Sequence, residues 1–376
     1  MNHTPPKKIL IIHSSVGQGH KVVAQNIAQG LKAYPYLEVS FLDITKFYQG
    51  PLVNSSTNLY KKILTRFPRL WRFMYCNKLF RKLTLPLRLP FARLKAKKLE
   101  SYLGKAQPDL ILCTQTTATA LVSYLKLAGK YTGKLVVVFS DYHFHPFWVY
   151  PAVDRFLVVI PEQISEIMKL GFAQKRVMVT GMPVALAYER TYDRVSVLNE
   201  FGLAKTKPLI LVMGGGMGFG IKIEDIKALL NCSFEIQVAV LTGLNQELFQ
   251  TLKKLEDSYP GNLKIFGMLP NQDVAKLFSA AKILVTKPGG LSVAEAILAN
   301  LPMIFVNPLP AVEELNQDYL VSSGAGVAAK NAQELLGWAE TLLSDRKFYQ
   351  EQKDRIQKLQ ISDAGSRAAK AIIDIL

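Results

Sequence analysis

Residues 286–310 read TKPGGLSVAEAILANLPMIFVNPLP, and this segment constrains the fold more than any other part of the chain. The apolar run Ile283–Val285 predicts a strand, Pro288-Gly289-Gly290 predict a tight turn, and a helix is expected from near Ser292. A second predicted strand, Met303–Val306, completes a β-α-β unit. A glycine-rich turn between strand and helix gathers unpaired backbone N–H groups at the positive end of the helix dipole. The segment therefore predicts a phosphate-binding turn.

The predicted helix also carries a carboxylate, Glu295, three residues after Ser292 and therefore in the expected first turn. A carboxylate this close to a phosphate would repel it, but it can accept hydrogen bonds from two adjacent ribose hydroxyls. The loop after the second strand adds Glu313 and Asn316. Together these positions predict a site for a nucleoside diphosphate. The alternative is an ordinary β-α-β turn in which Glu295 caps the helix.

TKPGGLSVAEA and the downstream EELNQDYL (residues 313–320) resemble the donor site of nucleotide-sugar glycosyltransferases with the two-domain GT-B fold. The resemblance is strongest to the family of monogalactosyldiacylglycerol synthases and processive diacylglycerol glucosyltransferases. A more distant relative is the transferase that adds N-acetylglucosamine to the peptidoglycan lipid precursor. The resemblance implies an α/β chain of two Rossmann-like doubly wound domains facing a cleft, with a UDP-sugar as donor substrate and no metal or other cofactor.

Two further segments extend the expected donor site. LVMGGGMGFG (residues 211–220) places glycines directly after an apolar run, where the backbone can approach a pyrophosphate closely; a flexible turn is the alternative. FGMLP (residues 266–270) matches the family segment whose backbone reads the uracil edge. The donor-binding residues implied by the resemblance are Gly19, Gly214, Gly215, Gly216, Met268, Leu269, Thr286, Lys287, Gly289, Gly290, Leu291, Ser292, Glu295, Glu313 and Asn316.

HSSVGQGHKVVAQNIAQGL (residues 13–31) follows the first predicted strand, with a helix expected from about His20. The third glycine of a dinucleotide turn is missing and Asp43 is a poor ribose partner, which argues against a nicotinamide site. GQGH resembles the family's GGGH or GNGH turn, which implies that His20 is the catalytic base; a capping or structural role is the alternative. The acidic residue that the family carries five positions earlier is replaced by Ser15. His20 therefore acts alone, or its acid comes from elsewhere.

SDYHFHPFW (residues 140–148) is the expected source of that acid, because it follows a predicted strand at the sheet edge where α/β sites form. It resembles the family element TDF-x-x-H-x-x-W, which implies a catalytic role for Asp141 and places His145 and Trp148 on the acceptor side. His143 and His145 also form an HxH pair, but no third metal ligand is nearby. The alternative is a buried loop with satisfied histidines.

Positive charge is concentrated in one segment. Residues 46–105 hold fifteen Lys or Arg and one acid, Glu100, which gives +14 of the chain's net charge of +17. Bulky apolar residues alternate with these charges, as suits a surface that sits in the headgroup layer of an anionic membrane. Nucleic acid and solvated helices are the alternatives, and no RNA-recognition, KH or helix-turn-helix signature supports the first. The expected membrane residues are Arg66, Arg69, Trp71, Arg72, Arg81 and Lys82.

Length and composition predict two domains, each able to bury a core. Mean hydropathy is high at +0.14, yet no run of about 18 apolar residues predicts a membrane span. The start, MNHTPPKKILIIHSS, lacks a secretory design, and the cysteines Cys76, Cys113 and Cys232 lack C-x-x-C spacing. These features predict a reducing compartment. The expected location is the cytoplasm, peripheral on the inner face of the plasma membrane.

Short β-rich runs alternate with helical stretches along the chain, and the pattern restarts after Gly181-Met182-Pro183. The expected domains are residues 1–183, which bind acceptor and membrane, and residues 184–362, which bind the UDP-sugar. A terminal helix over 363–376 is expected to pack back on the first domain. Residues 46–105 form a long insertion that Pro51, Pro68, Pro86 and Pro90 are expected to break into short pieces. The predicted strands are Ile9–His13, Val39–Leu42, Leu110–Cys113, Leu135–Phe139, Phe156–Ile160 and Val177–Thr180, then Leu209–Met213, Val238–Leu241, Leu263–Phe266, Ile283–Val285 and Met303–Val306.

The resemblance and the charge pattern together predict a membrane-associated inverting hexosyltransferase that moves a sugar from a UDP-sugar to diacylglycerol or a glycosyl-diacylglycerol, without nucleic acid as a partner. Two alternatives remain open. The acceptor is a polyprenyl-linked or another lipid, or the chain is a non-catalytic sugar-nucleotide-binding protein that lost its base function with the change to Ser15. The sequence does not choose between glucose, galactose and N-acetylhexosamine as the transferred sugar.

Overall fold

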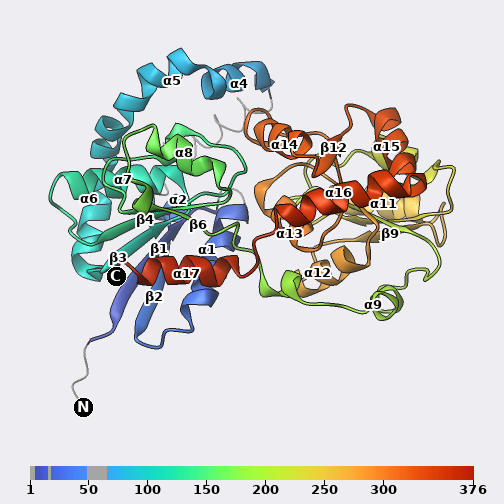
Figure 1. Ribbon diagram of the computed structural model, residues 1–376, viewed down its shortest axis with the longest axis horizontal. Helices are drawn as coiled ribbons and strands as arrows, with labels where there is room; N and C mark the ends of the chain where they lie inside the picture. The colour runs from blue at the N-terminus through green and yellow to red at the C-terminus, as the bar shows by residue number, and fades with distance from the viewer. Residues whose placement is uncertain (1–4, 16–17, 49–65) are drawn as a thin grey trace. The chain divides into compact units, whose positions relative to one another are not determined.

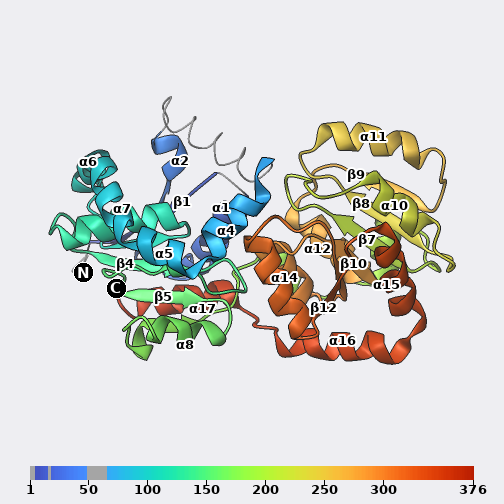
Figure 2. The same cartoon turned by 90° about the horizontal axis from the view of Figure 1, so that it is seen from above.

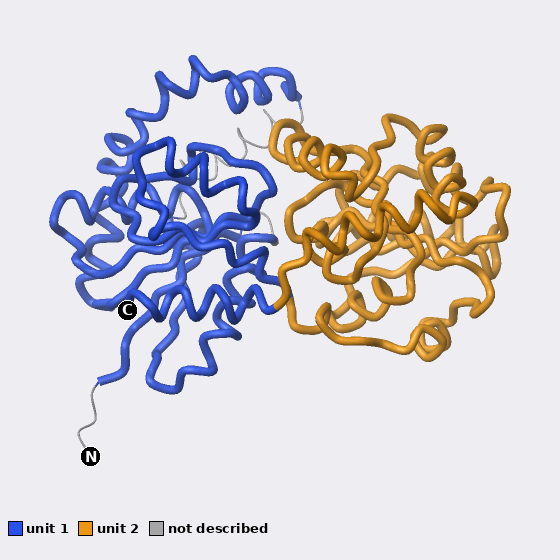
Figure 3. Tube along the Cα trace, viewed as in Figure 1, with its two compact units in different colours: residues 1–184, 363–376 blue, residues 185–362 orange. Residues whose placement is uncertain are grey.

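The computed structural model describes residues 5–15, 18–48 and 66–376. These residues form two compact units (Figure 3): unit 1 comprises residues 1–184 and 363–376, and unit 2 comprises residues 185–362. The expected boundary near residue 183 lies next to the division between the units. Each unit is a parallel sheet flanked by helices (Figures 1 and 2), which confirms the predicted pair of doubly wound α/β folds.

Unit 1 contains six parallel strands in the order β2-β1-β3-β4-β5-β6. The central strands are buried on both faces, as their continuous apolar runs predict. The strands are β1 (Lys7–His13), β2 (Leu37–Asp43), β3 (Leu110–Cys113), β4 (Lys134–Val138), β5 (Arg155–Val158) and β6 (Val177–Val179). The helices other than those of the insertion are α1 (Gln18–Leu31), α2 (Ile44–Phe47), α7 (Thr116–Leu127), α8 (Glu162–Met168) and α17 (Ala364–Ile373), with 3-10 turns η2 (Pro146–Trp148) and η3 (Gln174–Arg176).

The strand order of unit 1 reverses between β1 and β3, so the loops after these strands leave the sheet on opposite sides. A crevice forms at the carboxyl ends of the strands at such a point. The loop after β1 leads into α1 and carries His20 in its first turn, and the loop after β3 begins with Thr114. The topology therefore brings the GQGH segment to the position where doubly wound sheets bind ligands.

Described residues of the basic insertion form an arm of short helices on the outside of unit 1 (Figure 1). The arm comprises α4 (Pro68–Cys76), α5 (Lys78–Thr84), η1 (Leu85–Leu87) and α6 (Arg88–Ala106). Pro68 begins α4 and Pro86 lies in η1, as expected of residues that lack an N–H donor. The expectation for Pro90 was wrong, because it lies in the first turn of α6, where a helix tolerates proline. Pro51 lies outside the described residues.

The C-terminal helix α17 packs along α1, and two glycines allow the close approach. A Cβ atom at Gly30 would lie 2.6 Å from the carbonyl oxygen of Gly365, well inside van der Waals contact. The Arg155 side chain of β5 donates to the carbonyl oxygen of Ala371 at 2.7 Å, which ties the same helix to the sheet. The terminal segment is therefore an integral layer of unit 1.

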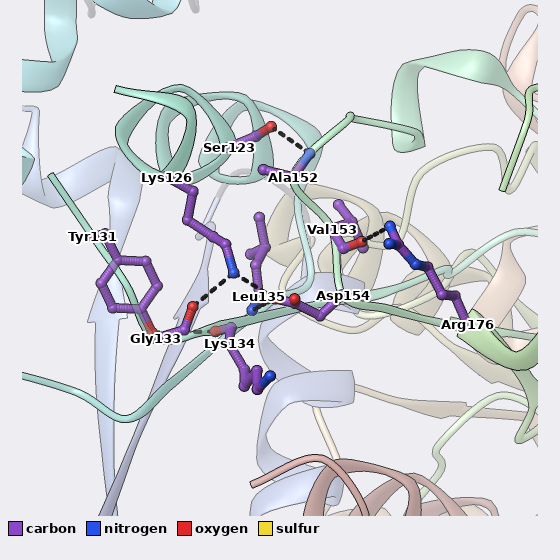
Figure 4. Close-up of polar contacts among 10 residues, drawn as sticks. All are labelled: Ser123, Lys126, Tyr131, Gly133, Lys134, Leu135, Ala152, Val153, Asp154 and Arg176. Carbon is purple, nitrogen blue, oxygen red and sulfur yellow. Dashed lines mark hydrogen bonds and ion pairs between the residues drawn. The ribbon is translucent and has the colours of Figure 1, made fainter. Parts of the chain in front are cut away.

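The amino ends of β4 and β5 are held by a polar network on the opposite edge from His20 (Figure 4). The Lys126 ammonium donates to the Gly133 carbonyl at 2.7 Å and pairs with Asp154 at 2.6 Å. The same carboxylate accepts from the Leu135 amide at 2.7 Å. The Tyr131 hydroxyl donates to the Lys134 carbonyl nearby, at 3.1 Å. This network holds the amino ends of β4 and β5 together, whereas the crevice lies at the carboxyl ends of the strands.

Unit 2 has the strand order β12-β11-β10-β7-β8-β9, all parallel, with its reversal between β7 and β10. The strands are β7 (Leu209–Met213), β8 (Gln237–Leu241), β9 (Leu263–Phe266), β10 (Ile283–Thr286), β11 (Met303–Phe305) and β12 (Gly326–Ala328). Strand β12 was not predicted, because three residues that begin with glycine give no periodic signal. The helices are α9 (Arg194–Glu200), α10 (Ile223–Leu230), α11 (Gln246–Glu256), α12 (Asn271–Ala280), α13 (Gly290–Leu298), α14 (Val312–Ser322), α15 (Ala332–Ser344) and α16 (Arg346–Lys358), with the 3-10 turn η4 (Leu186–Glu189).

Gly30→Ala should lower the free energy of unfolding by about 1–3 kcal/mol, because the added methyl group overpacks the contact between α1 and α17. Gly104→Ala in α6 is the matched control: its Cβ would meet nothing within 4 Å, and the change should stabilise by about 0.5–1 kcal/mol through helix propensity. Urea unfolding of both variants measures the difference. If Gly30→Ala unfolds at the wild-type urea concentration, α1 and α17 are not packed as described.

Candidate active site

The turn between β10 and α13 has the geometry of an anion site, with one correction to the predicted helix start. Helix α13 begins at Gly290, two residues earlier than expected, with Gly289 as its N-cap. The Gly289 amide donates to the Lys287 carbonyl at 2.8 Å, so it is used within the turn. The amides of Gly290, Leu291 and Ser292 come before the first intrahelical hydrogen bond, which Val293 donates to Gly289. These three N–H groups are the ones that can face a phosphate.

The glycine loop after β7 meets this turn, as the strand order requires. A Cβ at Gly215 would lie 3.8 Å from Lys287 Cε and 3.9 Å from Ser292 Oγ, so the two loops are neighbours. Gly215 and Gly218 have φ of +67° and +65°, a backbone region that favours glycine. At Gly218 a Cβ would also collide with the Thr242 carbonyl at 2.0 Å. The glycines at these two positions are therefore structural requirements of the loop that faces the turn.

Two side chains of α14, those of Glu313 and Asn316, contact the turn between β10 and α13. The Lys287 ammonium is ion-paired with Glu313, whose second oxygen accepts from the Leu309 amide at 2.7 Å. The Asn316 side chain is fully buried and donates to the Pro288 carbonyl at 3.2 Å. Both predicted residues thus contact the turn or its lysine and hold the turn in its shape. Thr286, also buried, ends strand β10 directly before it.

Hydrogen bonds connect the loop after β11 with the glycine loop and the helix that follows it. They involve Asn307 and Asp225, neither of which was predicted from the sequence. The Asn307 side chain donates to the Gly220 carbonyl at 2.9 Å and to the Asp225 carboxylate at 2.9 Å. Burial raises the pKa of Asp225 above its usual value, and the hydrogen bond from Asn307 opposes this shift. An asparagine after a strand is too common in loops to have been recognised as part of a site from the sequence.

The backbone is strained beside the site. Ala311 has φ 66° and ψ −71°, a γ-turn closed by the hydrogen bond from the Val312 amide to the Pro310 carbonyl at 2.9 Å. The Glu314 carboxylate accepts from the Ala311 amide at 3.0 Å and helps to hold the turn. A positive φ at an alanine costs of order 1–3 kcal/mol, and such strain is typical of functional sites. The strained turn fixes the start of α14 and with it Glu313.

Glu295 is buried in the second turn of α13, and this corrects its expected place in the first turn. Burial raises its pKa to about 8, against which the hydrogen bond donated by the Tyr188 hydroxyl acts. Tyr188 lies in η4 and is itself buried, which raises its own pKa and keeps it protonated. A buried acid costs stability, which favours a ligand-binding role over helix capping. Tyr188 was not predicted, because no motif marks the segment after residue 183.

The loop after β9 carries the residues expected at the nucleobase. Met268 is 57% exposed and Leu269 is half-buried, directly after Phe266 ends the strand. Because β9 is the edge strand of the sheet, this loop lies two strands away from the glycine loop of β7. Both loops leave the carboxyl edge of the sheet, so the predicted donor residues of unit 2 share one edge.

In unit 1 the crevice holds His20 in the first turn of α1, two residues after the helix begins, with Gly19 before it. The Thr114 hydroxyl donates to the His20 carbonyl at 3.0 Å. Burial lowers the pKa of His20, while the charge of Asp141 opposes this shift. Among the described residues the buried His20 Nδ1 has no hydrogen-bond partner. His20 is therefore uncharged at neutral pH, and the carboxylate that the sequence nominated, Asp141, is close enough for its charge to act on the ring.

A second acid at the carboxyl edge of the sheet, Asp43 at the end of β2, makes its contacts elsewhere. Asp43 caps α2 by accepting from the amides of Thr45 and Lys46, at 3.0 and 3.4 Å, and it also accepts from the Ser15 amide. Burial lowers the pKa of both His13 and His20; the charge of Asp43 opposes this shift at His13, and the charge of Asp141 opposes it at His20. Of these two carboxylates, Asp141 is therefore the one whose charge acts on His20.

Two family profiles match the chain. The family described as monogalactosyldiacylglycerol (MGDG) synthase matches residues 20–184, and the family described as group 1 glycosyl transferases matches residues 222–359. The chain is 26% identical over 373 residues to a protein of Bacillus licheniformis named processive diacylglycerol beta-glucosyltransferase, a match that covers 98% of this chain and 95% of that protein. The chain is a GT-B glycosyltransferase.

Solved structures agree with the predicted fold. MurG of Acinetobacter baumannii is 18% identical with a TM-score of 0.61, and the match covers 98% of this chain and 100% of that one. HepE of Anabaena, solved in complex with UDP-glucose, is 15% identical with a TM-score of 0.57, covering 98% and 99% of the two chains. The resemblance stated from the sequence is confirmed, as is the GT-B fold.

The glycosyltransferase uses His145 differently from the acceptor-binding role expected of it. His145 is buried, its Nδ1 accepts from the Phe147 amide at 3.2 Å, and its Nε2 donates to the Tyr75 carbonyl at 3.0 Å. Burial lowers its pKa to about 3, so the ring is neutral. Both ring nitrogens therefore have hydrogen-bond partners within the protein. This agrees with the alternative given for this loop, a buried loop with satisfied histidines. Trp148 is buried too, with its ring centroid 6.1 Å from that of His20.

The arm of the glycosyltransferase presents a row of exposed apolar side chains, which we call the apolar stripe. Its members are spaced mostly three or four residues apart, so they share a helix face within each short helix. The exposed basic residues Arg66, Arg69, Arg72 and Lys82 lie among them. The apolar stripe consists of Phe67, Leu70, Phe73, Leu79, Leu83, Leu87, Phe91 and Leu94, each between 49% and 79% exposed.

Two of the six expected membrane residues face inward instead. Trp71 is half-buried, and its ring centroid lies 5.9 Å from that of Tyr75. Arg81 is half-buried as well, and its charge is one of those that lower the pKa of His145. The sequence could not separate the faces, because the helices are too short and too often interrupted for a reliable period. No described helix is long and apolar enough to cross a membrane, and no group of metal-ligand side chains is assembled in the described part of the chain.

Glu295→Gln should weaken binding of UDP-glucose and abolish its pH dependence. Because the pKa of Glu295 is about 8 in the free protein, a carboxylate that accepts ribose hydroxyls must first lose its proton below pH 8. Wild-type affinity should therefore rise between pH 6.5 and 8, by up to about tenfold per pH unit, and level off above pH 8. Calorimetric titration at several pH values gives both affinities. Equal, pH-independent affinities of the two proteins would refute contact between Glu295 and the ribose.

Proposed function

We propose that this glycosyltransferase moves a hexose from a UDP-sugar to diacylglycerol or a glycosyl-diacylglycerol, with inversion at the anomeric carbon. The observation that carries the proposal is His20 in the first turn of α1, uncharged, subject to the charge of Asp141, and with its ring centroid 6.1 Å from that of Trp148 in the loop that carries Asp141. A neutral imidazole is the form that can take a proton, and a neighbouring carboxylate stabilises the imidazolium that results. Relatives over nearly the whole chain are named for transfer of glucose to diacylglycerol, which supports the acceptor class.

The proposed reaction is a direct displacement. The acceptor hydroxyl loses its proton to His20 while its oxygen forms a bond to the anomeric carbon of the sugar. The bond from that carbon to the β-phosphate oxygen breaks, and its electron pair leaves with UDP. Negative charge grows on the diphosphate, and Lys287 together with the amides of Gly290, Leu291 and Ser292 can offset it. We propose on this basis that the transfer needs no metal, so a chelator should leave the rate unchanged.

The ion pair of Lys287 with Glu313 bears on that step. In the donor-free protein Glu313 balances the ammonium charge, so the site is not an unpaired buried cation. An incoming diphosphate adds negative charge near the same ammonium, while Glu313 keeps its bond from the Leu309 amide. We propose that Glu313 positions Lys287 toward the diphosphate rather than contacting the donor. In this proposal Glu295 binds the ribose, and the loop of Met268 and Leu269 binds the nucleobase.

The apolar stripe and the basic residues around it are proposed to dock on the surface of an anionic membrane. Apolar side chains exposed by half or more are costly in water, and here they occur with exposed Arg and Lys side chains in the most positive segment of the chain. Docking would bring the enzyme to a lipid acceptor from the cytoplasmic side. A polyprenyl-linked acceptor would need the same surface, so the choice between lipids rests on the named relatives.

His20→Ala should reduce turnover by about 10²–10⁴-fold and leave affinity for UDP near wild type, since a base acts on the acceptor. Release of UDP from a UDP-sugar, measured with and without diacylglycerol vesicles, gives the rate. A wild-type protein that binds UDP but releases none with any lipid would favour the non-catalytic alternative. If His20→Ala keeps full activity, the base is another residue and Asp141 becomes the leading candidate.

Replacing four basic residues of the arm with serine should release the protein from anionic vesicles at low salt, since each contributes on the order of 1 kcal/mol. Replacing Phe67, Leu70 and Phe73 with serine should weaken vesicle binding at low and high salt alike, because insertion of apolar groups is not a charge effect. Co-sedimentation measures both. The basic residues replaced are Arg66, Arg69, Arg72 and Lys82; the charge-matched control replaces the exposed Lys175, Lys205, Lys254 and Lys347 outside the arm.

The control should bind vesicles like the wild type, and all three variants should bind UDP normally, because the predicted donor residues of unit 2 lie outside the arm. Wild-type protein that ignores anionic vesicles at low salt would overturn membrane docking and leave the apolar stripe to another partner.

A further inference from the structure

Helix α4 has two faces with different surroundings. Phe67, at its N-cap, and Leu70 and Phe73 within it belong to the apolar stripe and are about half exposed, whereas Tyr75 is only 7% exposed. Helix α4 therefore combines side chains of the proposed membrane contact with a buried tyrosine. Helix α4 belongs to the arm on the outside of unit 1 (Figure 1). Its Tyr75 contacts the loop that carries Asp141.

Tyr75 makes three polar or stacking contacts with this loop, across about 70 residues of sequence. Its hydroxyl is hydrogen-bonded to His143 Nε2 at 3.0 Å, and its carbonyl accepts from His145 Nε2 at 3.0 Å. Its ring stacks on His145 with centroids 3.8 Å apart and an interplanar angle of 22°. Because His145 is neutral and its Nδ1 accepts from the Phe147 amide, its tautomer is fixed and the contact is rigid.

Hydrogen bonds from one buried side chain connect His143, which Tyr75 contacts, with Asp141. The side-chain nitrogen of the buried Gln163 donates to the carbonyls of both Asp141 and His143, at 2.9 and 3.0 Å, while its oxygen accepts from the Val159 amide at 2.8 Å. Only one residue, Tyr142, separates Asp141 from His143, whose side chain Tyr75 holds. A displacement of His143 would therefore move Asp141, and the electrostatic support of His20 depends on where Asp141 stands.

A second residue of the arm holds the far end of the same loop. Arg88 of α6 donates to the Pro146 carbonyl at 3.4 Å, and its guanidinium lies 4.4 Å from the ring centroid of Tyr150. The arm thus contacts the loop at two places, through Tyr75 at His143 and through Arg88 at Pro146. Such contacts are more than a surface-docking segment requires.

We propose that Tyr75 is a positioning residue of the acceptor side, which sets the place of Asp141 relative to His20 through its hydroxyl contact with His143. The inference rests on the proposed function and assigns the basic arm a second role in the geometry of the active site. Tyr75 itself touches neither donor nor reacting atoms.

The test is Tyr75→Phe, which removes the hydroxyl and keeps the ring stack on His145. We expect kcat with diacylglycerol vesicles to fall about tenfold or more, with the affinity for UDP and the binding to anionic vesicles unchanged. Tyr131→Phe is the matched control: its hydroxyl is also buried in unit 1, but its hydrogen bond to the Lys134 carbonyl lies at the opposite edge of the sheet (Figure 4). This control should keep the wild-type kcat.

A double-mutant cycle completes the test. His143→Ala breaks the same hydrogen bond from the other side, so it should lower kcat similarly, and the double variant should be no slower than either single variant. If Tyr75→Phe is too unstable to purify, His143→Ala alone carries the test against Tyr131→Phe. Additive losses, a wild-type kcat in Tyr75→Phe, or a loss of vesicle binding that accounts for the lower rate would overturn the inference. Absence of transfer by the wild type would instead refute the proposed function.

Discussion

Strand order is the constraint on which both halves of this glycosyltransferase depend. In each unit the order of parallel strands reverses once, between β1 and β3 and between β7 and β10, and the loops that diverge there open a crevice. Each of these points coincides with a glycine-containing loop followed by a helix, so the amides of a first helical turn are available where a ligand would bind. We propose that the chemistry of each crevice is then set by one titratable side chain whose pKa burial shifts, His20 or Glu295.

Burial leaves both of these side chains uncharged in the resting protein. His20 has a lowered pKa and is neutral, and Glu295 has a pKa of about 8 and is mostly protonated at pH 7. Neither state is the most stable one that a protein could build, because a buried acid or an unpartnered ring nitrogen costs free energy. The strain at Ala311 adds to that cost. The two units therefore retain unfavourable groups at the positions where the sequence places the reaction, which is the usual mark of a functional site.

The sequence predicted features that follow from local rules. Apolar runs bounded by glycine gave eleven strands and the doubly wound class, and strand–glycine–helix segments located Lys287, Ser292 and His20. Features that depend on packing between distant segments were missed or misassigned. His145 was taken for an acceptor residue because nothing local shows that its Nε2 donates to the distant Tyr75 carbonyl and that its ring stacks on Tyr75. Arg81 and Trp71 were taken for membrane contacts because charge and aromaticity do not reveal which face of a short helix is buried. Strand β12 was missed because three residues carry no period.

The central claim is that a hydroxyl activated by His20 displaces UDP directly from the sugar. Proton NMR of the glycolipid made by the purified protein from UDP-glucose and diacylglycerol vesicles tests it most directly. UDP-glucose is α-linked, so a single displacement predicts a β-glucosyl lipid, seen as a large coupling between the first two ring protons. A product with the small coupling of an α-linkage, or no lipid product from any UDP-sugar, would contradict the account.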